Sequence, residues 1–179
     1  SASAVYYCFA CLMGQAVPLN EGCFRDIRVV TRPGTVTHAV YPAAVVAGNV
    51  ETSQRIVDVV LGALAQAVPE RIPAASCGTM SSVALGGEGW TYYETVGGGS
   101  GGGPGWEGES AVQCHMTNTL NTPAEALEMQ YPLRVTAYHV LSNGGAGLHP
   151  GGGGIRRTLQ ALADCEGTVL ADRRVTRPY

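Results

Sequence analysis

The residues best suited to chemistry lie between positions 115 and 121, directly ahead of a proline-containing turn. His115 can move a proton, and Asn118, Thr119 and Asn121 can hydrogen-bond to a substrate. We therefore take His115 as the candidate catalytic residue and the other three as candidate substrate-binding residues. In the alternative interpretation, the Asn and Thr side chains only satisfy turn and cap hydrogen bonds.

The position of this segment strengthens the functional interpretation. Thr122 is predicted to be the N-cap of a helix, with Pro123 in its first position and Glu125 three residues after the cap, as in a capping box. Free amides at a helix N-terminus favour an anion. We expect His115 and the neighbouring amides to contact a substrate or a phosphate at this junction.

A second loop-to-helix junction offers a carboxylate and a guanidinium. Glu51 and Arg55 are four residues apart at the start of a helix expected over 51–68, for which Asn49 is the predicted N-cap. They are second candidates for substrate binding. An ordinary cap with an exposed ion pair on one helix face is the alternative.

No metal site is predicted within this chain. Cys8 and Cys11 have the spacing of half a zinc site, but no second pair or nearby histidine follows them. Both lie in an apolar segment, which favours a structural role. The remaining cysteines and the histidines are scattered. Reduced thiols and a cytoplasmic location are therefore expected.

Glycine dominates residues 97–108, where bare backbone amides could bind a phosphate. Gly97, Gly99 and Gly102 match a dinucleotide-binding pattern, but no strand–turn–helix context surrounds them. A flexible lid or a subunit-contact loop is the favoured interpretation. A nucleotide-binding module built on this loop stays as an alternative.

Composition excludes several classes of function. The net charge is −3, all eleven basic residues are arginine, and charged residues make up only 14%. No basic run exists to bind nucleic acid or an anionic membrane, and no lysine exists for a Schiff base or a phosphate loop. The apolar run 4–13 is too short to span a bilayer. A surface this poor in charge suggests burial within a larger assembly.

The pattern of apolar residues and turns predicts an α+β fold: two main helices packed on a mainly antiparallel β-sheet, with long glycine-rich loops. No internal boundary is evident, so residues 1–179 are expected to be a single partial domain. Helices are expected at 3–13, 51–68 and 122–131, strands at 27–31, 79–85, 90–96, 111–116, 133–141, 155–162 and 167–172, a hairpin turn at 86–89, and an extended sheet edge at 35–46.

Several of these segments resemble the hydantoinase B/5-oxoprolinase family. His115 to Glu125 carries the specific signature His-Met-Thr-Asn-Thr-x-Asn-Thr-Pro-x-Glu. The other similar segments are 18–25, 47–58, 92–95 with the glycines that follow, the rest of 115–135, 144–147 and 172–174, so the resemblance covers essentially the whole chain.

The resemblance implies an ATP-dependent enzyme that opens cyclic amides such as hydantoins or 5-oxoproline; related complexes carboxylate ketones. It implies a hydantoinase A-type ATPase subunit or domain as partner, which activates the amide by phosphorylation, within a homo- and hetero-oligomer. It places ATP-Mg in that partner and the divalent metal in an N-terminal half without counterpart here. The chain is thus expected to be an internal or C-terminal-half fragment, inactive alone.

The chain departs from the family pattern in its C-terminal glycine loop. Ser142 and Asn143 precede the glycines where the family usually has Asp-Ser, and His149-Pro150 and Gly153 replace a basic and an apolar residue. We therefore place no catalytic role on this loop. A non-catalytic scaffold or subunit-interface segment is the alternative to a catalytic role for the chain.

Overall fold

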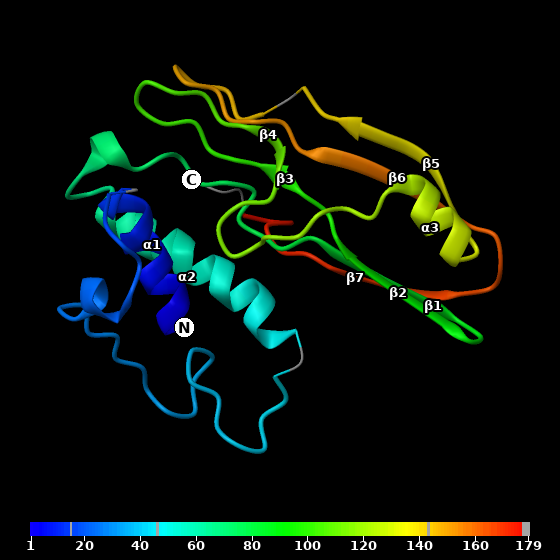
Figure 1. The fold of residues 1–179 in the computed structure, drawn as a ribbon, viewed down its shortest axis with the longest axis horizontal. Coiled ribbons are helices and arrows are strands. Elements are labelled where there is room, and N and C mark those ends of the chain that lie inside the picture. Colours follow the sequence, from blue (N-terminus) through cyan, green and yellow to red (C-terminus); the bar gives the residue numbers. More distant parts are fainter. Residues whose placement is uncertain (15, 46, 143, 177–179) are drawn as a thin grey trace. The chain divides into compact units, whose positions relative to one another are not determined.

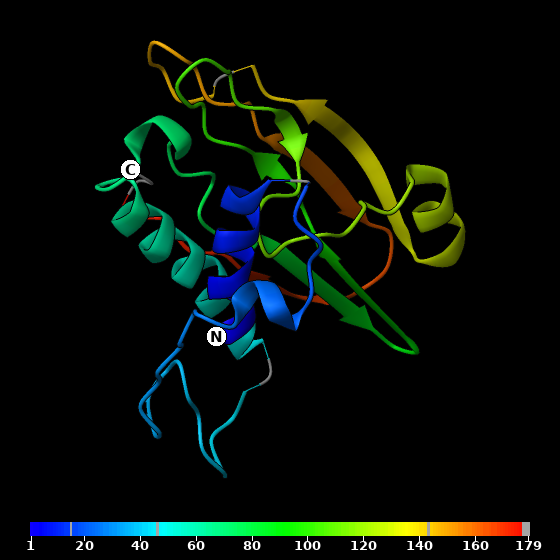
Figure 2. The same ribbon diagram turned by 60° about the vertical axis from the view of Figure 1, so that its left-hand side comes forward.

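The computed structural model describes residues 1–14, 16–45, 47–142 and 144–176. Contacts between Cα atoms divide the chain into two compact units, Ser1–Ile72 and Pro73–Tyr179, each described here by itself. Figures 1 and 2 show the helical first unit and the strand-rich second unit. This division does not test the expectation that residues 1–179 are part of one larger domain, which stays a prediction.

Two helices form the core of the first unit. Helix α1 (Ala2–Met13) ends at Gly14, as the apolar spacing predicts, and packs against α2 (Gly48–Leu64). Small side chains let the helices approach, because Ala4 and Cys8 on α1 are fully buried and the Cys8 thiol lies 4.0 Å from the Val57 carbonyl oxygen. Two 3₁₀ turns, η1 (Glu21–Phe24) and η2 (Pro69–Arg71), complete the regular structure.

Both ends of α2 differ from the prediction. The helix begins at Gly48 and its N-cap is Ala47, in the left-handed region with φ 57°, so Asn49 lies inside the helix and does not cap it. It ends at Leu64, four residues before the predicted end. Val68 lies outside the helical region, with φ −136° and ψ 59°, because a residue that precedes proline is disfavoured in that region.

The predicted strand at 27–31 and the predicted sheet edge at 35–46 are wrong. The described residues there form turns and loops, with an isolated bridge between Thr35 and His38. Val30 and Val36 are exposed. β-branched residues raise the tendency to be extended, but a strand also needs a neighbour with which to pair its backbone.

Among its described residues, the second unit contains three small antiparallel sheets. With the helices of both units, they confirm the predicted α+β class of the fold. The hairpin turn at 86–89 is also confirmed, since Gly89 has φ 76° and joins β1 to β2. The strand order is β2-β1-β7 in one sheet, and β3-β4 and β5-β6 form the others. The strands are β1 (Ser82–Gly87), β2 (Trp90–Thr95), β3 (Gly98–Gly99), β4 (Ser110–Val112), β5 (Leu133–Val140), β6 (Ile155–Ala161) and β7 (Glu166–Leu170).

Helix α3 (Ala124–Gln130) packs on β5 and closes the core of the second unit. Tyr92 on β2, Leu127 on α3 and Leu133 on β5 are buried together, and the Tyr131 ring lies 5.1 Å from that of Tyr92. The predicted N-cap is wrong. Pro123 occupies that position and Thr122 lies outside the helix.

The glycine-rich segments 97–108 and 144–154 are tied together by backbone hydrogen bonds. Gly152 N–H donates to Ser100 O at 2.9 Å, and Gly108 N–H donates to Pro150 O at 2.9 Å. A Cβ atom at Gly99 would overlap Gly152 O, and one at Gly153 would overlap Leu141 O. Only glycine permits backbones to approach this closely. The packing argues against a flexible lid.

Within the described ranges, no helix combines the length and the apolar character needed to cross a bilayer.

Candidate functional site

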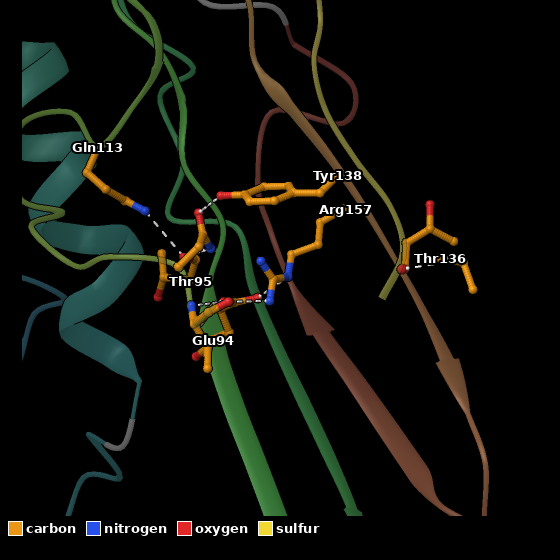
Figure 3. Close-up of polar contacts among 9 residues, drawn as sticks. Glu94, Thr95, Gln113, Thr136, Tyr138 and Arg157 are labelled. Atoms are coloured by element: carbon orange, nitrogen blue, oxygen red, sulfur yellow. Dashed lines mark hydrogen bonds and ion pairs between the residues drawn. The ribbon is translucent and has the colours of Figure 1, made fainter. Parts of the chain in front are cut away.

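A buried ion pair joins two sheets of the second unit. Arg157 on β6 and Glu94 on β2 approach with Nε 3.0 Å from Oε2, and their side chains are 1% and 2% exposed. Figure 3 shows the guanidinium extending from β6 toward the carboxylate. Buried charges are tolerated when they are paired and hydrogen-bonded, so further contacts are expected around this pair.

Those contacts converge on one residue, Thr122. Glu94 Oε1 accepts the Thr122 N–H at 2.7 Å, and Arg157 Nη2 donates to the Thr122 carbonyl oxygen at 2.6 Å. The Thr122 carbonyl oxygen is thus bonded to Arg157, and the first bond of α3, from Leu127 N–H, goes to Pro123 O instead, which explains why Thr122 does not cap α3. The negative group at this junction is the protein's own Glu94, at the place where the sequence suggested an external anion.

Asn121, the neighbouring residue, is held at both ends of its side chain. Its Nδ2 donates to Thr95 O at 3.1 Å, and Tyr138 OH donates to its Oδ1 at 3.2 Å. Thr95 O also accepts from Gln113 Nε2 at 3.2 Å. The Arg157 guanidinium lies 4.8 Å from the centre of the Tyr138 ring, a cation–π contact (Figure 3). Asn121 thus links β2 and β5 to the segment before α3.

The cluster is buried enough to shift the pKa of a tyrosine beside it. Burial raises the pKa of Tyr92, and the nearby Thr122 side chain opposes part of that shift. The phenol is therefore neutral around pH 7 and can only donate or accept a hydrogen bond. Within the part of the chain that the structure describes, the cluster offers fixed dipoles and paired charges, which orient neighbours.

His115 lies in a tight turn beside this cluster in sequence. Thr117 N–H and Oγ1 both bond to Cys114 O, at 3.1 and 2.7 Å, and His115 has φ 56°. A non-glycine residue in the left-handed region costs about 1–2 kcal/mol. Ala47, Ala111 and Arg173 share this left-handed backbone, so the conformation alone does not single out His115. Its side chain is half-buried.

The other predicted site residues fall in different surroundings. Asn118 and Thr119 are exposed, and Leu120 beside them is 95% exposed. Asn121 joins the cluster around the ion pair. The roles predicted for these four residues, His115 included, stay predictions.

Glu51 and Arg55 belong to α2 in the first unit, so they form part of a separate compact body. Arg55 Nη1 lies 3.8 Å from Asp58 Oδ2, one helical turn away. Asp58 and Gln54 are buried on the same face of α2 as Val57. The predicted role of Glu51 and Arg55 in substrate binding stays a prediction.

The six cysteines are free thiols. Burial raises the pKa of both Cys8 and Cys114 to about 12, whereas Cys11 is exposed. A thiol with so high a pKa stays protonated and makes a poor metal ligand or nucleophile. Among the residues that the structure describes, no three His, Cys, Asp or Glu side chains come close enough together to hold a metal ion.

Comparison with known proteins shows the family of this chain. The family model described as hydantoinase B/oxoprolinase matches residues 1–179. The chain belongs to this family. It is 41% identical to 5-oxoprolinase 1 of Arabidopsis thaliana, covering 99% of this chain and 14% of that protein. It is 40% identical to 5-oxoprolinase of Dictyostelium discoideum, with 98% and 14% covered.

A bacterial relative from Pseudomonas is named as the putative B-type subunit of a D-/L-hydantoinase. It is 35% identical over 90% of this chain and 28% of its own length. The chain thus spans about one seventh of the length of the 5-oxoprolinases it matches and just over a quarter of the Pseudomonas protein. No solved structure matches the chain.

The ion pair was missed in the sequence, although a signal for it exists. Residues 155, 157 and 159 of β6 point to one face because side chains alternate along a strand, and Ile155 and Leu159 flank Arg157. On β2, Glu94 follows buried Tyr92 at the same spacing. Two opposite charges in inward positions of two strands predict a buried pair.

Proposed function

We propose that this chain is part of an ATP-dependent enzyme that hydrolyses cyclic amides, opening a hydantoin or 5-oxoproline ring. The observation that carries the proposal is the family match along all 179 residues, with 5-oxoprolinases of two organisms about 40% identical over nearly the whole chain. A relative named as part of a hydantoinase supports the same class of substrate.

In this proposal the chain does not act alone. A hydantoinase A-type ATPase subunit or domain holds ATP-Mg, whose phosphoryl group activates the amide, and a divalent metal is bound outside this chain. The Pseudomonas relative is named as one subunit of a hydantoinase, which supports a homo- and hetero-oligomeric complex. We place this complex in the cytoplasm, in keeping with the free thiols.

His115 and the segment that follows it would contact the substrate. The half-buried imidazole orients the amide or moves a proton, and Asn118 and Thr119 present exposed polar groups beside it. Asn121 holds this segment in place through its own contacts. Glu51 and Arg55 are second candidates for substrate contact.

The test is ring opening by the complete enzyme that contains this chain, together with its ATPase partner. With ATP-Mg, we expect hydrolysis of 5-oxoproline or of a hydantoin, coupled to release of phosphate. Without ATP, turnover should fall to background. The chain alone should show no turnover. Ring opening at the same rate with and without ATP would refute the proposal, and so would the absence of ring opening with both classes of substrate.

A scaffold or subunit-interface role is a second candidate, for a cyclic amidase or a related ketone carboxylase. Large apolar side chains lie exposed in both units, Val36 and Tyr41 in the first and Leu120 and Leu148 in the second. Contact with other protein would cover such side chains, which is the reason to test this candidate. Under this candidate, variants of His115 and Glu51 would fail to assemble before they failed in chemistry, and size-exclusion chromatography would reveal that failure.

A further inference from the structure

Two charged side chains that the proposed function leaves without a role, Glu94 and Arg157, converge on the backbone of the candidate site. We propose that this ion pair, with Tyr138, is a positioning device that fixes residues 115–122 for the reaction. The inference rests on the proposed function for its kinetic consequence, although its structural part does not.

The first argument is the direction of the bonds. The Glu94 carboxylate accepts a hydrogen bond from the Thr122 N–H, and the Arg157 guanidinium donates one to the Thr122 carbonyl oxygen. The negative group thus binds the backbone donor of Thr122, and the positive group binds its backbone acceptor. Hydrogen bonds to charged groups are stronger than those between neutral groups. The ion pair therefore holds the position and the orientation of Thr122 together.

The second argument is burial. Both side chains are at least 98% buried, so water does not compete for these bonds, and the pair cannot shift without leaving a charge unpaired. Weaker, solvent-exposed hydrogen bonds would be sufficient to hold an ordinary surface turn. Fixed geometry of this kind is what a substrate-orienting segment requires, because displacement of about 1 Å can cost about 100-fold in rate.

The third argument is that Tyr138 extends the device to Asn121. Its hydroxyl donates to Asn121 Oδ1 at 3.2 Å, and its ring lies against the Arg157 guanidinium. Strands β2, β5 and β6 thus each contribute one side chain that bonds to Asn121 or Thr122. The exposed residues Asn118 and Thr119 therefore lead directly into a point of the chain that is held from three strands.

The experiment uses the complete enzyme and two substitutions that preserve the fold. Arg157→Lys keeps a positive charge near Glu94 but cannot form the planar fork that also reaches Thr122 O. Tyr138→Phe keeps the ring and removes only the bond to Asn121. Each has a matched control: Arg156→Lys, exposed on the same strand, and Tyr93→Phe, whose hydroxyl donates to Ser82 Oγ instead.

Two readouts are needed, at a temperature where all variants are folded. Hydrogen exchange of the peptides covering 115–123 should quicken about three- to tenfold in Arg157→Lys and Tyr138→Phe, since each loses one bond that holds the segment. Steady-state kinetics should show kcat lowered, or KM raised, about three- to tenfold in the same two variants. The two controls should match the wild type in both readouts.

Unchanged exchange in 115–123, or equal changes in the controls, would overturn the positioning role. Faster exchange with unchanged kcat and KM would overturn its link to the reaction, because a purely structural role leaves the kinetics of the folded enzyme unaltered. If the wild type opens no cyclic amide, the proposed function fails, and the exchange data still decide whether Arg157 and Tyr138 fix the segment.

Discussion

Glu94 on β2 and Arg157 on β6 meet inside the protein and bond to the two ends of the same residue, Thr122. The pair is therefore a tertiary link as well as an ion pair. It joins strands of two different sheets to the segment that leads into α3. Its contribution to stability can be separated from its contribution to the site.

Removal of one partner should be far worse than replacement of both. Glu94→Ala leaves a buried guanidinium without its charge partner, which costs about 3–5 kcal/mol. The double variant Glu94→Leu/Arg157→Met removes both charges and fills similar volume, so it should lose less than half as much. Thermal unfolding of the complete protein measures both. A double variant as unstable as the single one would contradict this explanation.

Two variants of His115 should lose activity alike and differ from each other in stability. In the complete enzyme, His115→Ala and His115→Gly should each lower turnover at least about tenfold, which is about 1.4 kcal/mol of barrier. Glycine relieves the left-handed backbone at φ 56°, so His115→Gly should be more stable than His115→Ala by about 1 kcal/mol.

His139, exposed on β5, provides the control for this pair of variants. His139→Ala should keep wild-type turnover and stability. If His115→Gly retained full turnover, His115 would not belong to the site. If the glycine variant were less stable than the alanine variant, the left-handed turn would not be the source of strain.

The two glycine-rich segments should tolerate a methyl group at some positions and reject it at others. Gly153→Ala would force a Cβ into Leu141 O, so we expect misfolding or a clearly lower melting temperature. Gly154→Ala places its Cβ in open space and should be nearly neutral. Soluble yield and the melting temperature of the complete protein measure both. Equal behaviour of the two variants would show that Gly153 does not pack against the Leu141 backbone.

These segments are also not expected to bind nucleotide. The amides of Ser100, Gly103 and Gly108 already donate to backbone carbonyls of Glu109, Trp106 and Pro150, so they are not free to cradle a phosphate. When ATP-Mg is added to the complete enzyme, hydrogen exchange in peptides covering 97–108 should not change. Protection there at millimolar ATP would instead support the nucleotide-binding alternative.

How far the sequence predicts the structure depends on whether the signal is local. The hairpin between β1 and β2 was predictable, because aromatic and β-branched runs flank a glycine turn in which Gly89 needs φ 76°. Helix α1 ends at Gly14 for a similarly local reason. The segment 27–31 has the composition of a strand and forms none, since no other described segment pairs with its backbone.

The candidate site shows the same division. The alternation of Ile155, Arg157 and Leu159 marks an inward-facing arginine, but the identity of its partner depends on which strands meet in space. Thr122 has the sequence of an N-cap, and an arginine from a distant strand, which donates to its carbonyl oxygen, overrides that local preference. Sequence therefore located the segment, whereas tertiary contacts decided which of its groups are occupied.

The two buried thiols predict a loss of stability at high pH. Burial raises the pKa of Cys8 and Cys114 to about 12 from 9.0, so between these values the folded state keeps protons that the unfolded state releases. Stability from this source is complete below pH 9 and falls as the pH rises toward 12.

Urea unfolding of the complete protein from pH 8 to 11 should show this decrease, and Cys114→Ala should make it less steep. At pH 8, iodoacetamide should label exposed Cys11, on the same helix as Cys8, and should label Cys8 and Cys114 only after unfolding. Mass spectrometry of peptides identifies the labelled thiols. Labelling of Cys8 or Cys114 in the folded protein as fast as Cys11 would contradict the buried, protonated state, because only an accessible thiolate reacts at that rate.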